Sequence, residues 1–168
     1  IIAGCISYIE SFYLGDWLNE PFTSTKDYYD NNSFCMEVAA SGCLRILYEQ
    51  AGREIICTPE GASCYPIEEY ETLTQEMYGF SLPCTASASC PEGMAEMPYG
   101  YGAQMTDIRI LPEHAFLKDG IVHVVAELLW KDYGMPPEPI GYLEYQFQYS
   151  NTYTFFPYTL LSISKIEL

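Results

Sequence analysis

Basic residues are scarce in this chain. Its 168 residues include 7 Lys and Arg against 23 Asp and Glu, which gives a formal net charge of -16. A field of this sign repels phosphate backbones and anionic lipid surfaces, so we do not expect a nucleic-acid partner. The chain also lacks any run of 18 apolar residues, and no segment of it is long enough to cross a bilayer as a helix.

The short motifs of common enzyme classes are also missing. The sequence contains no GxSxG, HExxH, P-loop, GxGxxG or EF-hand pattern, and no CxxC pair that would indicate zinc. A nucleophilic dyad of Cys64 with His114 or His123 is an alternative, but nothing in the local sequence pairs them. We therefore expect no catalytic residues, no metal and no cofactor.

Two polar stretches have simple structural explanations. The segment "DYYDNNS" at residues 27–33 offers oxygen ligands of the kind that calcium prefers, but turn and helix-cap chemistry explains the same residues. Glu68, Glu69 and Glu71 follow Pro66, at the start of an expected helix, where the helix dipole favours acidic side chains. We expect these glutamates to be solvated.

The composition is that of a folded protein. Hydrophobic residues make up 49% of the chain, which includes 16 Tyr and 8 Phe, and its length is that of one ordinary domain. We expect a short helix within residues 6–18, a loop over residues 19–33, and a helix that Asn32 or Ser33 caps and that ends near Gly52. A further helix is expected between Pro66 and Gly79.

From residue 103 onward the hydrophobic period is two, which predicts strands at residues 103–111, 121–130, 140–149 and 153–168. Asp119-Gly120 is a hairpin signal, and Pro157 places the last strand at an edge or a bulge. Residues 121–130 are apolar on nearly both faces, which favours a central strand. We therefore predict an α+β domain, with N-terminal helices packed on one face of a four-stranded antiparallel meander.

In outline, this order of elements resembles the cystatin-like and NTF2-like folds, in which a curved sheet wraps around helices. It is also similar to small exported domains of Gram-positive lipoproteins, where a helix ending in "YGF" or "FGI" precedes such a meander, as Tyr78-Gly79-Phe80 does here. The resemblance covers about residues 66–168. It implies a fold rather than an activity.

The segment "IIAGC" resembles the lipobox of bacterial lipoproteins, in which an aliphatic residue and two small residues precede the lipidated cysteine. Ile2, Ala3, Gly4 and Cys5 match that pattern. The resemblance implies that Cys5 carries a diacylglycerol anchor, that residues 1–5 are the end of a signal peptide with its lipobox, and that residues 6–168 form the single domain. The alternative is that Ile1, Ile2 and Ile6 begin a buried element in which Cys5 is packed.

Seven cysteines leave six once Cys5 is set aside. Cys35 and Cys43 lie eight residues apart in one expected helix, about 12 Å along its axis, and are too far apart to pair. Short loops separate Cys57 from Cys64 and Cys84 from Cys90, so each of these pairs can close a disulfide. The alternative is free thiols in a reducing habitat.

A long loop without periodicity, residues 83–102, carries Met94, Met97, Tyr99 and Tyr101. A second loop follows Trp130 and contains Tyr133 and Met135. If the two loops meet, Tyr99, Tyr101, Trp130 and Tyr133 form an aromatic surface suited to protein, peptide or sugar contacts. Alternatively, they cover the open end of the sheet.

These observations favour a non-catalytic, lipid-anchored domain at the outer face of a bacterial membrane that binds a protein or cell-wall partner. An inhibitor of a cell-wall peptidase is one concrete version. The rival is an NTF2-like small-molecule enzyme or ligand carrier, with Asp107, Glu127 or Tyr145 inside the cone of the sheet. A secreted structural protein stabilised by disulfides is a third class.

Overall fold

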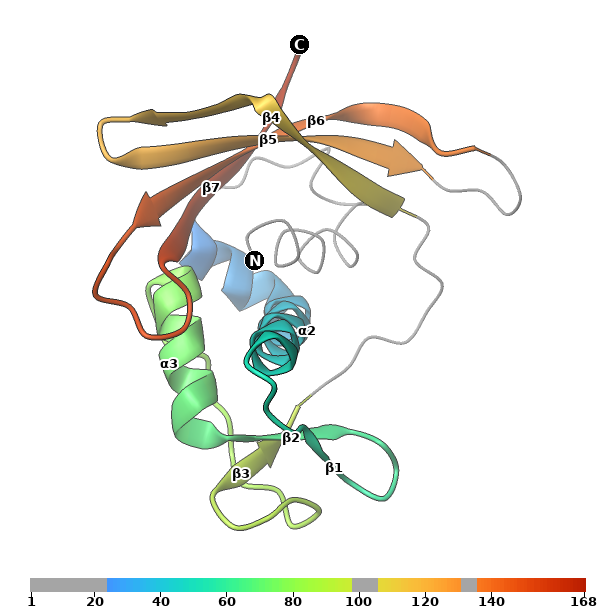
Figure 1. Ribbon diagram of the computed structural model, residues 1–168, viewed down its shortest axis with the longest axis vertical. Helices are drawn as coiled ribbons and strands as arrows, with labels where there is room; N and C mark the ends of the chain where they lie inside the picture. Colours follow the sequence, from blue (N-terminus) through green and yellow to red (C-terminus); the bar gives the residue numbers. More distant parts are fainter. Residues whose placement is uncertain (1–23, 98–105, 131–135) are drawn as a thin grey trace.

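The computed structural model describes residues 24–97, 106–130 and 136–168. Labels follow Figure 1. The described elements are α2 (Thr25–Gln50), β1 (Ile56–Cys57), β2 (Ser63–Pro66), α3 (Ile67–Tyr78), β3 (Met94–Glu96), β4 (Thr106–Lys118), β5 (Ile121–Trp130), β6 (Glu138–Tyr149) and β7 (Tyr158–Ile166). Two helices and two antiparallel sheets in this part of the chain confirm the α+β class.

The larger sheet is the predicted antiparallel meander, with strands in the order β4-β5-β6-β7. Strand β5 is internal and has the predicted bounds, while β7 is an edge strand that begins directly after Pro157. Asp119 and Gly120 join β4 to β5 with φ of 51° and 81°, the positive values that a two-residue hairpin turn of type I′ requires. Pairing of each strand with its chain neighbour confirms the topology expected from the two-residue period.

Alternation along β6 separates a dry face from a polar one. Leu143, Tyr145 and Phe147 are buried, and they share a core with residues of β5 and β7 and with Ala39 of α2. Tyr142, Glu144 and Gln146 lie on the opposite face, which we call the outer face of the larger sheet. The alternation predicted from the sequence is therefore confirmed.

Helix α2 begins at Thr25, about two turns before the expected cap at Asn32 or Ser33. Residues 25–33, expected as a loop, are helical. Individual Asp, Asn and Ser residues lower helix propensity only slightly, and tertiary contacts override it. Thr25 donates its hydroxyl hydrogen to the carbonyl oxygen of Tyr78, and Lys26 pairs with Asp30 one turn on. These contacts extend the helix through the turn formers.

Helix α3 matches its prediction. Tyr70, Leu73 and Met77 form its buried face, Glu68 and Glu69 lie in its first turn, and Gly79 ends it in the left-handed conformation with φ of 80°. The amide of Gly79 donates to the carbonyl oxygen of Gln75, as expected of such a cap. The capping signals of the sequence therefore fix this helix accurately.

A second sheet, with strands in the order β1-β2-β3, was not expected. Its strands are two to four residues long, which is too short for a hydrophobic period to be recognised. Strand β3 lies inside the segment 83–102 that we expected to be structureless. That expectation is therefore wrong for residues 94–96, which gain their order by pairing with β2.

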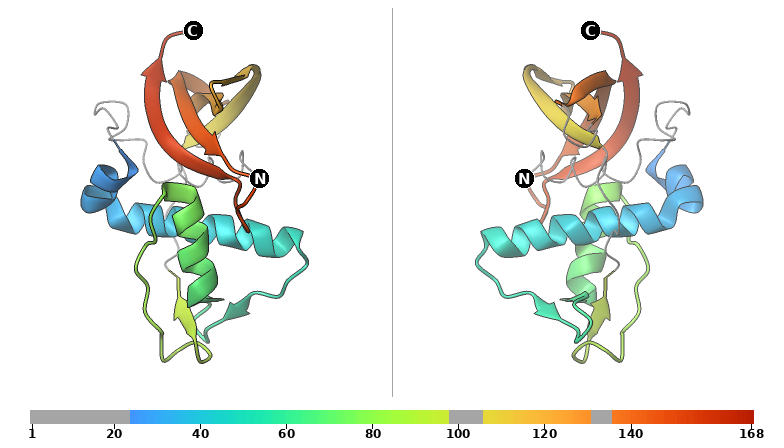
Figure 2. Two further views of the ribbon diagram at one scale, coloured as in Figure 1. Left: turned by 90° about the vertical axis from the view of Figure 1, so that its left-hand side faces the viewer. Right: turned by 90° about the vertical axis from the view of Figure 1, so that its right-hand side faces the viewer.

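The two helices lie between the larger sheet and the small one (Figures 1 and 2). Their buried residues pack mainly against each other and against the small sheet, in a core that includes Leu44, Tyr65, Leu73 and Phe156. On the larger sheet, the helices contact chiefly β7. The predicted arrangement, with the helices spread over one face of that sheet, is therefore not the main packing of the described helices.

One carboxylate connects the helical part to the larger sheet. Glu76 of α3 is buried and accepts hydrogen bonds from the backbone amides of Thr154, Phe155 and Phe156, the last two at 2.8 Å. The hydroxyl of Thr159 donates to the backbone oxygen of Glu76 at 2.6 Å. Because these residues form the start of β7 and the segment before it, Glu76 fixes where the sheet meets α3.

Candidate functional site

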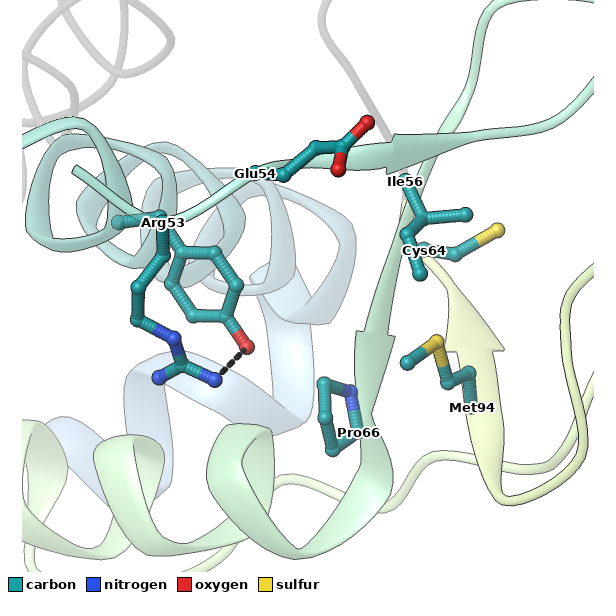
Figure 3. A pocket seen from close by; sticks show the side chains of 7 residues that line it. Arg53, Glu54, Ile56, Cys64, Pro66 and Met94 are labelled. Carbon is teal, nitrogen blue, oxygen red and sulfur yellow. Dashed lines mark hydrogen bonds between the residues drawn. The ribbon is translucent and has the colours of Figure 1, made fainter.

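A hollow of about 290 Å³ lies between the end of α2 and one face of the small sheet (Figure 3). Its lining is largely apolar. It is lined by Tyr48, Arg53, Glu54, Ile56, Cys64, Pro66 and Met94. We refer to this space as the hollow.

The strand register explains why the four lining side chains that come from the small sheet face the same way. Ile56 pairs with Cys64, and Pro66 pairs with Met94, so the four lie on one face of the sheet. Tyr65, between Cys64 and Pro66, points to the other face and is buried in the helical core. A short three-stranded sheet thus has one face in the core and presents the other to the hollow.

The end of α2 supplies the polar wall. Gly52 has φ of 64°, and the turn it allows lets the amide of Arg53 donate to the carbonyl oxygen of Tyr48 at 2.9 Å. The guanidinium of Arg53 then lies over the Tyr48 ring, 3.9 Å from its centroid. Both nitrogens at the end of Arg53 donate to the Glu69 carboxylate at 2.9 Å, and the Tyr48 hydroxyl donates to the same carboxylate at 2.7 Å.

Tyr48, Arg53 and Glu69, which we call the triad, are each held in one protonation state near neutral pH. Hydrogen bonds from Arg53 lower the pKa of Glu69, while the bond to Glu69 raises the pKa of Arg53. Burial, together with the hydrogen bond to Glu69, raises the pKa of Tyr48. Tyr48 therefore stays protonated, and Glu69 and Arg53 stay charged. Such groups position a ligand well but exchange protons poorly.

The sulfur at the hollow is also unreactive as a nucleophile. Cys64 forms a disulfide with Cys90, with 5.8 Å between their Cα atoms. The alternative of a catalytic dyad built on a Cys64 thiol is therefore wrong for this structure. His123 instead lies on the outer face of the larger sheet, where Nδ1 is 3.1 Å from an oxygen of Glu144 and the ring stacks on Phe116.

The predicted pairings of Cys57 with Cys64 and of Cys84 with Cys90 are wrong. Cys57 lies opposite Ser63 in the β1 and β2 hairpin, so its side chain points to the other face from that of Cys64. Cys57 is exposed, and Cys84 is a half-buried thiol whose pKa is raised to about 11, chiefly by burial. Within the described residues, only Cys64 and Cys90 of the four are bonded.

Of the four aromatic residues predicted to form a docking surface, three lie outside the described residues. These are Tyr99, Tyr101 and Tyr133, and Cys5 lies outside them as well. Trp130 ends β5 with 41% of its surface exposed. The segment 83–102 also carries two methionines. Met94 lines the hollow, while Met97 is buried in the helical core.

The residues proposed for a cone in the sheet do not converge. Tyr145 is fully buried in the core of the larger sheet. Glu127 lies on the outer face, where it pairs with Arg109 and accepts a hydrogen bond from Tyr142 at 3.3 Å. The side chain of Asp107 lies outside the described ones. A shared pocket for Glu127 and Tyr145 is excluded because their side chains point to opposite faces.

Among the residues that the structure describes, no three His, Cys, Asp or Glu side chains are grouped so as to hold a metal ion. Residues 27–33, the alternative calcium site, lie within the first turns of α2. No helix in the described ranges is both long enough and apolar enough to cross a membrane.

Glu69→Gln is expected to make stability less sensitive to acid. Arg53 holds the pKa of Glu69 below its ordinary value of 4.5, so the ionised carboxylate stabilises the fold above that pH. This stabilisation is lost as the pH falls through the lower pKa of the folded state. Urea unfolding from neutral pH to about pH 3 should therefore show a shallower fall in the free energy of unfolding for the variant.

Glu68→Gln, at an exposed neighbouring position, is the control and should retain the original slope. Glu37, whose pKa burial raises, contributes a dependence of opposite sign in both variants and therefore cancels in the comparison. Equal slopes for Glu69→Gln and the unaltered protein would contradict the triad.

Sequence patterns missed Tyr48, Arg53 and Glu69 as a group. They are 5 and 16 residues apart along the chain and come together only through the turn at Gly52 and the packing of α2 on α3. The only local signal was Arg53 itself, one of seven basic residues, directly after a helix-ending glycine.

No protein-family model, curated protein or solved structure matches the chain.

Proposed function

We propose that this protein is a non-catalytic binding domain, held at the outer face of a bacterial membrane by a lipid on Cys5, and that it binds a protein or cell-wall partner at the hollow. The observation that carries the proposal is the combination of an apolar lining with polar groups that are already paired. Arg53, Glu69 and Tyr48 satisfy one another, and Cys64 is bonded to Cys90. Such a site gains free energy by excluding water from a partner.

Export is supported by two independent features. The IIAGC segment matches a lipobox, and the disulfide between Cys64 and Cys90 is typical of proteins that fold in oxidising compartments. A diacylglycerol anchor would hold the domain at the membrane despite its net charge of -16. Inhibition of a cell-wall peptidase remains one specific version of this function, and kinship with cystatin-like or NTF2-like domains remains part of the proposal.

The binding site is tested by filling the hollow. Ile56 lines it with 40% of its surface exposed, and Ile140 of β6 is equally exposed on the larger sheet. Small apolar amides such as N-acetyl-leucinamide should shift the methyl resonances of Ile56 and Met94 in the unaltered protein and in Ile140→Trp. Ile56→Trp should abolish the shift at Met94. Shifts that survive in Ile56→Trp, or that are absent throughout, would overturn the hollow as the binding site.

The anchor is tested separately, by intact mass spectrometry of protein made in a bacterial host that exports it. We expect loss of residues 1–4 and a diacylglyceryl group on Cys5. A Cys5→Ala variant should lose both the added mass and sedimentation with membranes. An unmodified Cys5 would remove the lipid anchor and leave the binding site untouched.

A further inference from the structure

We infer that the partner segment at the hollow is a basic peptide, with one apolar side chain in the hollow and flanking Lys or Arg residues beside its rim. This inference rests on the proposed binding function and specifies the chemistry of the partner. It is carried by the size of the hollow and by the charges that surround it.

The size of the hollow favours a side chain over a cofactor. Its volume of about 290 Å³ is just below the roughly 300 Å³ at which the range for ligand sites begins. The walls formed by Ile56, Pro66 and Met94 offer an apolar seat for one branched or aromatic side chain. Among the described residues, Arg53 is the one basic residue that lines the hollow, and its pairing with Glu69 leaves no free cation on these walls to bind an anionic group.

Three carboxylates lie on the segments that line this seat or adjoin them. Glu54 lines the hollow, and its carboxylate points away from Arg53 (Figure 3). Glu96 lies opposite Cys64 on β3, so the register places its side chain on the same face as Ile56 and Cys64. Glu92 is exposed in the turn that leads into Met94. We call Glu54, Glu92 and Glu96 the acidic rim.

The acidic rim is not neutralised by the triad. The charge of Arg53 is balanced by Glu69, so the three rim carboxylates leave an excess of negative charge beside the apolar lining. The net charge of -16 acts in the same direction at longer range and speeds the encounter with a cationic partner. Charge complementarity therefore selects a basic segment over an acidic or neutral one.

The probe is a synthetic pentapeptide, acetylated and amidated, with a central Leu and two Lys on each side. Its affinity for the full, oxidised chain is measured by calorimetry at low and at physiological ionic strength, and its position is read from the Ile56 and Met94 methyl resonances. Replacing the central Leu by Ala should weaken binding about tenfold or more. Ile56→Trp should have a similar effect. Raising the salt concentration should weaken binding further.

The charge contribution is measured with Glu54→Gln/Glu96→Gln, which should lower affinity about threefold to tenfold and flatten the salt dependence. Glu113→Gln/Glu138→Gln changes the net charge equally, at exposed positions on the larger sheet, and is the matched control. It should leave affinity nearly unchanged. Equal losses in both double variants would show attraction to the overall charge alone, and would overturn a basic segment seated on the acidic rim.

Peptides with Ser or Glu in place of Lys separate this inference from the function on which it rests. If they bind as well as the basic peptide, the inference fails and the hollow remains a binding site. If no peptide binds while N-acetyl-leucinamide still shifts the Met94 methyl resonance, the inference also fails and the hollow also remains a binding site. If neither peptides nor amide act at the hollow, the proposed function fails as well.

Discussion

Glu76→Ala should lower the free energy of unfolding by about 3 kcal/mol, because three backbone amides at a partly buried junction lose the carboxylate that accepts their hydrogen bonds. The amides of Thr154, Phe155 and Phe156 belong to the segment that leads into β7, and no other group in the described contacts accepts from them. Urea unfolding of the purified domain measures the loss directly.

A shape-matched variant separates charge from packing. Glu76→Gln keeps the volume of the side chain but replaces one accepting oxygen by a donor, which would face backbone N–H groups, so we expect most of the loss to persist. Glu68→Ala, on the exposed face of the same helix, is the control and should cost less than about 1 kcal/mol. A Glu76→Ala loss no larger than that of the control would show that the junction does not depend on the carboxylate.

Removing the disulfide should have an effect of similar size. Cys64 and Cys90 are 26 residues apart, and closure of a loop of that length stabilises a fold by roughly 3.5 kcal/mol in the chain-entropy model. Cys64→Ala/Cys90→Ala should therefore unfold at markedly lower urea concentration than the oxidised protein. Because Cys64 also lines the hollow, the variant should bind N-acetyl-leucinamide more weakly.

Cys57→Ala is the matched control, since this thiol is exposed and unbonded. It should leave stability within about 0.5 kcal/mol of the unaltered protein and should prevent exchange with the neighbouring disulfide. Peptide mapping under non-reducing conditions checks the connectivity. A peptide joining Cys57 to Cys64, or Cys84 to Cys90, would contradict the pairing of Cys64 with Cys90.

The parts of the fold that the sequence predicted are those in which one physical signal repeats over many residues. Strand β6 alternates between its two faces over residues 142–147, and α3 has both an acidic first turn and a glycine at its end. Strand β1 has two residues, so no period can develop, and its order depends on pairing with β2. The early start of α2 was missed because its first turn is stabilised by Tyr78, more than fifty residues away.

The site was harder to predict than the fold because it depends on pairs distant in sequence. Glu69 was expected to be a solvated residue at a helix start, as Glu68 is, yet the turn after α2 brings Arg53 within hydrogen-bond distance of it. The bonding partner of Cys64 depends on which face of β2 its side chain occupies, which only the strand register defines. Local composition carries no information on either point.

The link through Glu76 also bears on the order in which the chain can fold. Strands β4 to β7 each pair with their neighbour in sequence, so the larger sheet can assemble through short hairpin closures. The hydrogen bonds of Glu76 to residues 154–156 span 78 to 80 positions, and closing a loop of that length costs more entropy. We therefore expect α3 to dock on β7 late in folding, after the larger sheet and the helical part have each gained structure.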